Sequence, residues 1–195
     1  MLIEAGLFEL LHGLAGKSAP LDFLFILVAR WLPYVLVIVA AFFLLTRKGT
    51  VMRVWGICIV ALTVILSRGI LVELITYLYA RPRPNVFLGF DSLIPALTSA
   101  FPSGHASAFF ALAAAIYFLN KEWGWWFWIL AGMNAIARVI SGVHWPTDIL
   151  GGFLVALFSF FAVKKLLIPF APKAQGGEVP AQEPLSVEGK IESSQ

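Results

Sequence analysis

The chain has 195 residues, of which 60% are hydrophobic and only 13% are charged, and its formal net charge is +3. Soluble domains carry roughly 25% charged residues, so this chain has too few polar side chains to cover a soluble globule. The composition therefore predicts an integral membrane protein with one main domain, and it argues against nucleic acid as a partner because no basic face is available. Cys58 is the single cysteine, which excludes an intrachain disulfide and a metal site built from two cysteines.

The first 15 residues have the pattern of an amphipathic helix and lack the basic start of a signal peptide. Residues 2–15 keep Glu4 and Glu9 off a helical face that is formed by four leucines, Leu7, Leu10, Leu11 and Leu14. We expect this helix to lie at the membrane interface, with His12 on its polar face rather than acting as a ligand. A frayed terminus is the alternative.

Five apolar segments follow, and each is interpreted as a membrane-spanning helix. They run over residues 23–45, 54–79, 106–119, 125–143 and 149–167. The third is shorter than the roughly 20 residues that span the hydrocarbon, unless its polar entry turn also lies at membrane depth. The sequence thus predicts an all-α integral membrane protein, a helical bundle of about five transmembrane helices plus the N-terminal amphipathic helix.

The last part of the chain differs in composition from the rest. Residues 171–195 are rich in Gly, Pro, Gln, Glu and Ser and show no apolar periodicity. They are interpreted as a disordered cytoplasmic tail without a catalytic part, which follows a membrane domain over residues 1–170.

The cations outside the polar motifs predict the orientation in the membrane. They follow the first, third and fifth segments: Arg47, Lys48, Arg53, Lys121, Lys164, Lys165 and Lys173. With five spans these places share one side, which the positive-inside rule assigns to the cytoplasm. The N-terminal helix, the loop 80–105 and the stretch 138–148 then share the outer side.

Arg81-Pro82-Arg83-Pro84 ends the second segment. Prolines block the continuation of a helix, so both arginines should lie on a stiff extended turn. A membrane-edge anchor is the alternative for this pair, because arginine favours interfaces.

Ser103-Gly104-His105 opens the third segment. Ser103 is a good helix N-cap, and Gly104 lets a ligand approach the backbone. Free amides at a helix start make an anion site, and His105 on the first turn would face it. The alternative is a capped helix whose His is merely interfacial.

The stretch from Arg138 to Asp148 combines a cation, an imidazole and a carboxylate at the edge of apolar sequence, where charge is costly. His144 and Asp148 are four residues apart, so one helical turn would bring them within reach. A carboxylate on one ring nitrogen fixes the tautomer and frees the other nitrogen to attack. The alternative is a capped helix start with a satisfied interfacial His.

These parts suit phosphoryl transfer, which requires a phosphate to be positioned and its charge neutralised. Arg83, Arg138, Ser103 and the amide of Gly104 can serve the equatorial oxygens. The imidazole that Asp148 orients, His144, is the expected nucleophile, which would form a phospho-His, and His105 is the expected acid. The site holds little acidic oxygen for Mg²⁺, so we expect a reaction that needs no metal and no cofactor.

Arg83-Pro84, then Pro-Ser-Gly-His at 102–105, then Arg-x5-His-x3-Asp at 138–148 resemble the three motifs of the type 2 phosphatidic acid phosphatase (PAP2) family. The resemblance spans roughly residues 7–168. It implies a helical membrane core, a phospho-His intermediate and no metal. It also implies a lipid phosphate as substrate and membrane lipids as surroundings.

The chain departs from the family pattern at two positions. Thr76 stands where the family has a Lys, and Ala137 stands where it has a Ser. We consider the hypothesis that Arg81 supplies the missing charge in phosphate binding. Arg68 and Glu73 are unusual in the outer half of a membrane helix, and they are interpreted either as a structural pair, which we favour, or as residues that shape the site.

Within the family, the layout most resembles bacterial undecaprenyl-diphosphate phosphatases of the bacitracin-resistance type. Shared features are the Phe-Glu-Leu-Leu-His-Gly-Leu helix, a Leu-Asp before the first segment, and a Leu-Ile-Thr-x-x-Tyr run before the Arg-Pro motif, with Thr76 at the Lys position. Those proteins often have Asp in place of Gly104. The resemblance implies removal of the terminal phosphate of undecaprenyl diphosphate at the periplasmic or extracellular face of a bacterial inner membrane, which regenerates carrier lipid for cell-wall synthesis.

Other functions stay open at this point. One is a phosphatase of the same family that acts on phosphatidylglycerol phosphate, phosphatidate or lipid A. Another is a transporter or anion-binding membrane protein without turnover, although binding alone needs no oriented nucleophile. A third is transfer of the phosphoryl group to an acceptor other than water.

Overall fold

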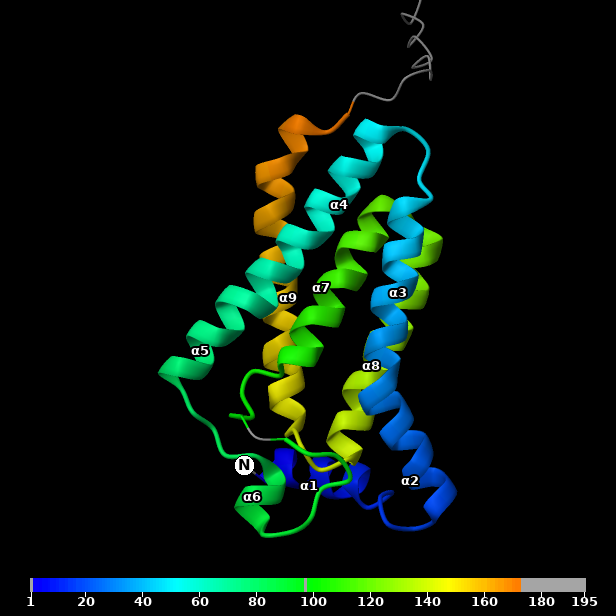
Figure 1. Cartoon of the computed structure of the whole chain (residues 1–195). Helices are drawn as coiled ribbons and strands as arrows, with labels where there is room; N and C mark the ends of the chain where they lie inside the picture. Colours follow the sequence, from blue (N-terminus) through cyan, green and yellow to red (C-terminus); the bar gives the residue numbers. More distant parts are fainter. Residues whose placement is uncertain (1, 97, 173–195) are drawn as a thin grey trace, which may run out of the picture.

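A computed structural model describes residues 2–96 and 98–172, and within these ranges it contains helices and no strand. The elements form a bundle of long helical rods, with short helices gathered at one end (Figure 1). Their bounds are α1 Leu2–His12, α2 Ala19–Ile26, η1 Leu27–Trp31, α3 Leu32–Leu45, α4 Thr50–Val64, η2 Ile65–Leu71, α5 Val72–Leu78, α6 Pro84–Leu88, α7 Gly104–Leu119, α8 Lys121–Ile140, α9 Pro146–Leu167 and η3 Ile168–Phe170. The predicted tail lies outside the described residues from position 173 onward.

Three rods are long and apolar enough to cross a membrane. They are the continuous helices Ala19–Leu45, Thr50–Leu78 and Pro146–Phe170. At a rise of about 1.5 Å per residue, each exceeds the hydrocarbon thickness of about 30 Å. α7 is a shorter apolar helix, and it begins at Gly104, so the polar entry turn belongs to it. The prediction of an all-α membrane protein is confirmed.

α7 is the central helix of the bundle. It packs against α4, α8 and α9, and most of its residues from Ala106 to Ile116 are buried. Alanines at Ala111, Ala113 and Ala115 let the neighbouring backbones approach closely, which is how helices associate where lipid competes for apolar side chains. A helix that is covered by other helices needs no full lipid-facing length, which accounts for a third segment of only 16 residues.

The first two rods each contain a π-helical stretch, which the sequence did not reveal. In η1, the carbonyls of Val28 and Ala29 accept hydrogen bonds from the Asn134 amide of α8, at 2.8 and 3.2 Å. In η2, Ser67 donates to the carbonyl of Ser107 on α7 at 3.2 Å and also contacts its hydroxyl. The π-helical turn of η1 leaves backbone carbonyls free for such contacts.

The two ends of the bundle have different character. The α3–α4 and α7–α8 connections and the C-terminal end of α9 lie together at the upper end in Figure 1, and they carry those of the predicted cytoplasmic cations that lie between Arg47 and Lys165. There Arg47 donates to the Leu119 carbonyl at 3.1 Å, and Lys164 lies over the Phe118 ring. α1, α6 and the loops after α5 and α8 lie at the opposite end.

α1 ends at His12, three residues before the predicted end, and its protein-facing side differs from the expected one. Phe8 is 2% exposed whereas Leu10 is 71% exposed, so Glu4, Phe8 and His12 point into the protein and the leucine face largely points away. His12 donates from Nδ1 to the Ile140 carbonyl at 2.8 Å and stacks on Phe8. In water, leucines pack against the protein and polar side chains face outward. Next to hydrocarbon this preference is reversed, because polar groups find their partners in the protein and leucines can face lipid.

Candidate active site

The three polar stretches are joined directly by backbone hydrogen bonds. The Ala100 amide donates to the Arg81 carbonyl at 2.9 Å, and the Ser103 amide donates to the Asp148 carbonyl at 3.0 Å. Arg83 completes the connection by donating from Nη1 to the Val143 carbonyl at 2.7 Å. Three stretches that are separate in the sequence therefore form one local structure.

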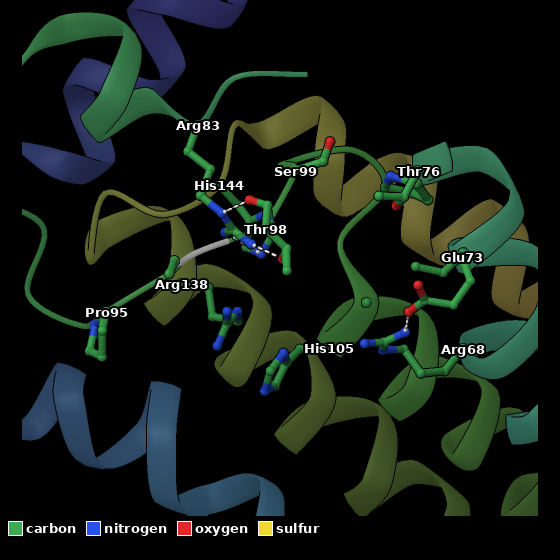
Figure 2. A pocket seen from close by; sticks show the side chains of 14 residues that line it. Arg68, Glu73, Thr76, Arg83, Pro95, Thr98, Ser99, His105, Arg138 and His144 are labelled. Atoms are coloured by element: carbon green, nitrogen blue, oxygen red, sulfur yellow. Dashed lines mark hydrogen bonds and ion pairs between the residues drawn. The ribbon is translucent and has the colours of Figure 1, made fainter. Parts of the chain in front are cut away.

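A cavity of about 250 Å³ lies where these stretches meet, and both imidazoles line it. Figure 2 shows His144 beside Arg83, and the His105 ring pointing into the cavity between Arg138 and Arg68. Thr98 and Ser99 from the loop before α7 line the same cavity. The structure thus brings together both predicted histidines and two of the predicted arginines.

His144 is 2% exposed and has one defined tautomer. Its Nδ1 lies 3.0 Å from the Ala100 carbonyl oxygen, which can only accept, so Nδ1 carries the proton and Nε2 keeps a lone pair in the neutral ring. Burial, followed by the positive charges of Arg138 and Arg83, holds the pKa of His144 well below its ordinary value. The ring is therefore a neutral imidazole with its free nitrogen at the cavity.

The relation of His144 to Asp148 differs from the predicted helical turn. His144 precedes α9, and Asp148 lies in its first turn, with Nδ1 and Oδ2 3.6 Å apart. The Asp148 carboxylate instead accepts from the Trp145 amide at 2.7 Å and from Arg81 Nη1 at 2.8 Å. The shorter contact to Nδ1 comes from the Ala100 carbonyl. This contact could not be predicted from the side chains in the sequence, because it is made by the backbone.

Arg83 is fixed by four hydrogen-bonding contacts and is only 6% exposed. Nε donates to the Thr98 carbonyl at 2.6 Å, Nη2 to the Thr98 hydroxyl at 3.1 Å, and Nη1 to Val143 and to Nε2 of His144 at 3.3 Å. Burial lowers its pKa, yet a guanidinium remains charged at neutral pH. Its charge is therefore held next to the imidazole.

Arg138 reaches the cavity from the last turn of α8 and is also 6% exposed. Its Nη1 donates to the Ala29 carbonyl at 3.4 Å, while its buried Nε makes no hydrogen bond to any residue that the structure describes. A buried donor without a partner is costly, and an anion in the cavity would satisfy it. Asn134, one turn earlier on α8, is bound to the same η1 carbonyls and holds this part of α8 in place.

The start of α7 has the predicted cap. Ser103 accepts from the Ala106 amide at 3.4 Å and is fully buried. Gly152 of α9 lets the helices approach here, because a Cβ at this position would lie 2.6 Å from the Ser103 carbonyl oxygen. Gly104 borders the cavity, and its missing side chain leaves room for the guanidinium of Arg68.

Arg81 has partners other than those expected for a phosphate-binding residue. Its Nη2 donates to Glu4 at 2.9 Å, and its Nη1 donates to Asp148 and to the Thr147 hydroxyl at 2.7 Å. Burial opposes both charges, but it is outweighed: the Thr147 hydroxyl and Arg81 lower the pKa of Glu4, and Glu4 and Asp148 raise the pKa of Arg81. Arg81 borders a second, more apolar pocket beneath α1 rather than the cavity of the two histidines.

Arg68 and Glu73 form the ion pair that we favoured, and both also line the cavity. Thr98, Asn134 and the Ala100 carbonyl also contribute to the site, and they were not predicted from the sequence. Asn134 carried a usable signal, since a polar amide in an apolar helix one turn from Arg138 needs a buried partner. Thr98 and Ala100 carried none, because a loop contact depends on the fold.

Known proteins resemble this chain in sequence and in fold. The undecaprenyl-diphosphatase BcrC of Bacillus subtilis is 31% identical over 84% of this chain and 86% of its own length. The lipid A 4'-phosphatase of Porphyromonas gingivalis is 27% identical over 92% of this chain and 79% of its own length. The crystal structure of Aquifex aeolicus LpxE, at 24% identity, has the same fold with a TM-score of 0.69 over 83% of this chain and 94% of that chain.

The sequence model of the family described as the PAP2 superfamily matches residues 56–169, which include the three polar stretches and the helices that carry them. The match covers more than half of the chain and agrees with the three motifs and their shared cavity. The chain belongs to the PAP2 superfamily.

Proposed function

We propose that this membrane protein removes the terminal phosphate of undecaprenyl diphosphate through a phospho-His intermediate. The observation that carries the proposal is the orientation of His144, whose Nδ1 donates to the Ala100 carbonyl while Nε2 faces a cavity with Arg83. An imidazole held in one tautomer, neutral and beside two guanidinium groups is suited to attack phosphorus.

In the first step, Nε2 of His144 forms a bond to the terminal phosphorus, and the bond from that phosphorus to the bridging oxygen breaks. The leaving lipid monophosphate takes a proton from His105, which lines the same cavity and becomes charged once the negative diphosphate offsets the nearby arginines. Arg83 and Arg138 bind the equatorial oxygens, and the Nε of Arg138 gains the acceptor that it lacks among the described residues. The start of α7, with Ser103 and Gly104, adds its amides and dipole.

In the second step, water attacks the phospho-His. His105, now neutral, takes a proton from that water, inorganic phosphate leaves, and His144 regains its lone pair. Asp148 and the Ala100 carbonyl keep the imidazole oriented throughout, because both lie on its Nδ1 side. Three arginines line the cavity and Glu73 is the single carboxylate among its described lining residues, which is a poor ligand set for Mg²⁺, so the proposed reaction uses no metal ion.

The choice of undecaprenyl diphosphate relies on similarity to the BcrC protein of Bacillus subtilis, which carries that activity in its name. A Sulfolobus acidocaldarius protein named undecaprenyl-diphosphatase is also 31% identical, over 81% of this chain. Other relatives are named as a lipid A 4'-phosphatase and a phosphatidylglycerophosphatase, so the test compares several lipid phosphates.

The orientation in the membrane is part of the proposal. The cation-rich end of the bundle belongs in the cytoplasm by the positive-inside rule, together with the C-terminus. The cavity then opens at the periplasmic or extracellular face, where carrier lipid is released as diphosphate for recycling.

The decisive test measures phosphate release by the purified protein in EDTA from undecaprenyl diphosphate, phosphatidate, phosphatidylglycerol phosphate and lipid A. The expected result is the highest kcat/KM with undecaprenyl diphosphate and no loss in EDTA. His144→Ala should lower turnover by at least roughly a thousandfold, because the covalent step disappears.

His12→Ala is the matched control, since His12 lies in α1 and stacks on Phe8 rather than lining the cavity. It should keep most of the activity. A higher kcat/KM with another lipid would identify that lipid as the substrate instead of undecaprenyl diphosphate. Full activity in His144→Ala would contradict the assignment of His144 as the nucleophile. If the wild type bound phosphate but turned over none of these lipids, the result would contradict the phosphatase function and support an anion-binding protein.

A further inference from the structure

Arg68 is a cavity-lining cation that the chemistry above does not use. It belongs to η2 and lines the cavity together with Glu73, Gly104 and His105. Its guanidinium lies over the start of α7, because a Cβ added at Gly104 would stand 2.6 Å from its Nε and 3.1 Å from its Cζ. The missing side chain at position 104 is what lets this guanidinium reach the edge of the phosphate site.

The partner of Arg68 can be exchanged at low cost. Arg68 pairs with Glu73, and the two side chains are 45% and 60% exposed. Both side chains line the cavity, and an ion pair that water reaches there contributes little to stability, because it is screened and both long side chains lose freedom. The lipid-linked phosphate of a diphosphate, which accepts in a bidentate manner and gains charge when its bridging bond to the terminal phosphorus breaks, can therefore take the place of Glu73.

The position of Arg68 relates it to the leaving group rather than to the attacked phosphate. Arg83 contacts the nucleophile His144 at 3.3 Å, whereas Arg68 packs on Gly104, the neighbour of the acid His105 in the chain. Phosphoryl transfer places the attacking and leaving groups on opposite sides of phosphorus. Figure 2 shows the Arg68 guanidinium on the His105 side of the cavity and away from His144, so a group that departs toward His105 would lie next to it.

We propose that Arg68 binds the second phosphate of the substrate, the one that leaves with the lipid, and so selects lipid diphosphates over lipid monophosphates. This inference rests on the proposed phosphatase function. Cleavage of a diphosphate releases a lipid monophosphate, which keeps negative charge after His105 has protonated its oxygen. Cleavage of a monophosphate releases a neutral alcohol, which offers Arg68 no charge to neutralise.

Glu73 then acts as a counter-ion that holds Arg68 at the cavity edge and gives it up when the second phosphate arrives. Because Glu73 competes with the substrate for the same guanidinium, its removal should favour the diphosphate. Thr76, at the position where the family has a Lys, lines the cavity one turn after Glu73 and leaves this side without another cation from α5. Arg68 supplies that charge from η2.

The test compares the hydrolysis of undecaprenyl diphosphate and undecaprenyl monophosphate by Arg68→Gln, Arg68→Lys and the wild type. Loss of a charge-assisted contact should lower kcat/KM for the diphosphate about tenfold in Arg68→Gln and leave the monophosphate within about twofold. Arg68→Lys should fall between, since it keeps the charge and loses the fork. Arg30→Gln is the matched control, because Arg30 is an exposed arginine of the other π-helical stretch, over Trp31.

Inhibition gives a second measurement that does not depend on monophosphate turnover. In Arg68→Gln, inorganic pyrophosphate should inhibit about tenfold more weakly, whereas orthophosphate should inhibit as in the wild type. Glu73→Gln should lower KM for the diphosphate. An equal fall for both substrates, an equal change for both inhibitors, or a loss in Glu73→Gln that matches Arg68→Gln would overturn the assignment.

The two proposals can fail separately. A wild type that releases no phosphate from undecaprenyl diphosphate would overturn the proposed function and this inference with it. A wild type that cleaves the diphosphate well, with Arg68→Gln unchanged in both assays, would overturn the role of Arg68 alone.

Discussion

Arg83 and His144 lie against each other, with Nη1 3.3 Å from Nε2. Since Nδ1 of the same ring donates to the Ala100 carbonyl, the guanidinium donates to the lone pair that would attack phosphorus. A phosphate oxygen is a stronger acceptor than an imidazole nitrogen, so we expect an anion in the cavity to draw this donor away. Binding of the phosphate would then free the nucleophile that attacks it.

The pH dependence of turnover should reflect this arrangement. Burial and the charges of Arg138 and Arg83 keep the pKa of His144 well below its ordinary value, so the ring stays neutral as the pH falls through 6.5. We expect no loss of kcat from protonation of His144 near pH 6.5. Arg83→Gln removes one of these charges and should raise the pKa of His144. The acidic limb of the residual kcat profile should then shift to higher pH. Asp148, Arg138 and His105 also face this ring and are unchanged in the variant.

The same shift has a consequence for stability. A His whose pKa is lower in the folded state contributes stability that is present above its unfolded pKa of about 6.5 and is lost as the pH falls toward the folded pKa. Thermal unfolding of the wild type should therefore move to lower temperature below pH 6.5, and less so in His144→Ala. An identical pH dependence in both proteins would contradict the lowered pKa.

Arg81 should affect kcat more than KM, because it contacts Asp148 and Glu4 rather than the phosphate cavity. Arg81→Gln and Glu4→Gln should each lower kcat, by roughly tenfold to a hundredfold for Arg81, since a small displacement of Asp148 and His144 is costly. The double variant should lose less than the sum of the two, because the residues act through one contact. A large rise in KM with kcat intact would instead place Arg81 on the phosphate, as the sequence hypothesis has it.

Asn134 should stabilise the bundle and position Arg138. Its amide donates to the Val28 and Ala29 carbonyls of η1, and Arg138 uses the Ala29 carbonyl as well. Asn134→Leu should cost about 1–3 kcal/mol, because buried carbonyls lose their partner, and it should raise KM through Arg138. Met133→Leu, a change at the exposed neighbouring residue, is the control and should leave both unchanged. Unfolding in detergent and steady-state kinetics measure the two effects.

Two glycines of α8 provide a matched test of helix packing. A Cβ at Gly124 would lie 2.2 Å from the Cα of Tyr117 on α7, whereas a Cβ at Gly132 meets nothing within 4 Å. Gly124→Ala should destabilise the protein by about 1–3 kcal/mol or more, because backbone must move. Gly132→Ala should be neutral or stabilise slightly, since alanine favours the helix. Thermal unfolding of the two variants in the same detergent checks this, and equal effects would contradict the close α7–α8 contact.

Much of the fold, and most of the residues that meet at the candidate site, could be predicted from the sequence. Long apolar runs indicate helices that are surrounded by lipid, and the all-α membrane bundle was predicted from them. Arg83, Ser103, Gly104, His105, Arg138 and His144 stood out because polar groups beside hydrocarbon need a reason to be there. Their three motifs also led to the family, which the sequence model over residues 56–169 confirms.

Only the tertiary structure showed which partners these residues contact. The Ala100 carbonyl sets the His144 tautomer, Arg81 pairs with Glu4 and Asp148, and Arg68 rather than Arg81 reaches the cavity through the space at Gly104. Each of these contacts joins positions that are far apart in the chain, so no local pattern encodes it. The sequence by itself determined which groups could do chemistry in a membrane. The free-energy cost of placing a side chain next to hydrocarbon depends on its residue type, so costly polar residues stand out without a structure. Only packing decided which of them meet, because hydrogen bonds and ion pairs depend on distances of a few ångströms between separate helices.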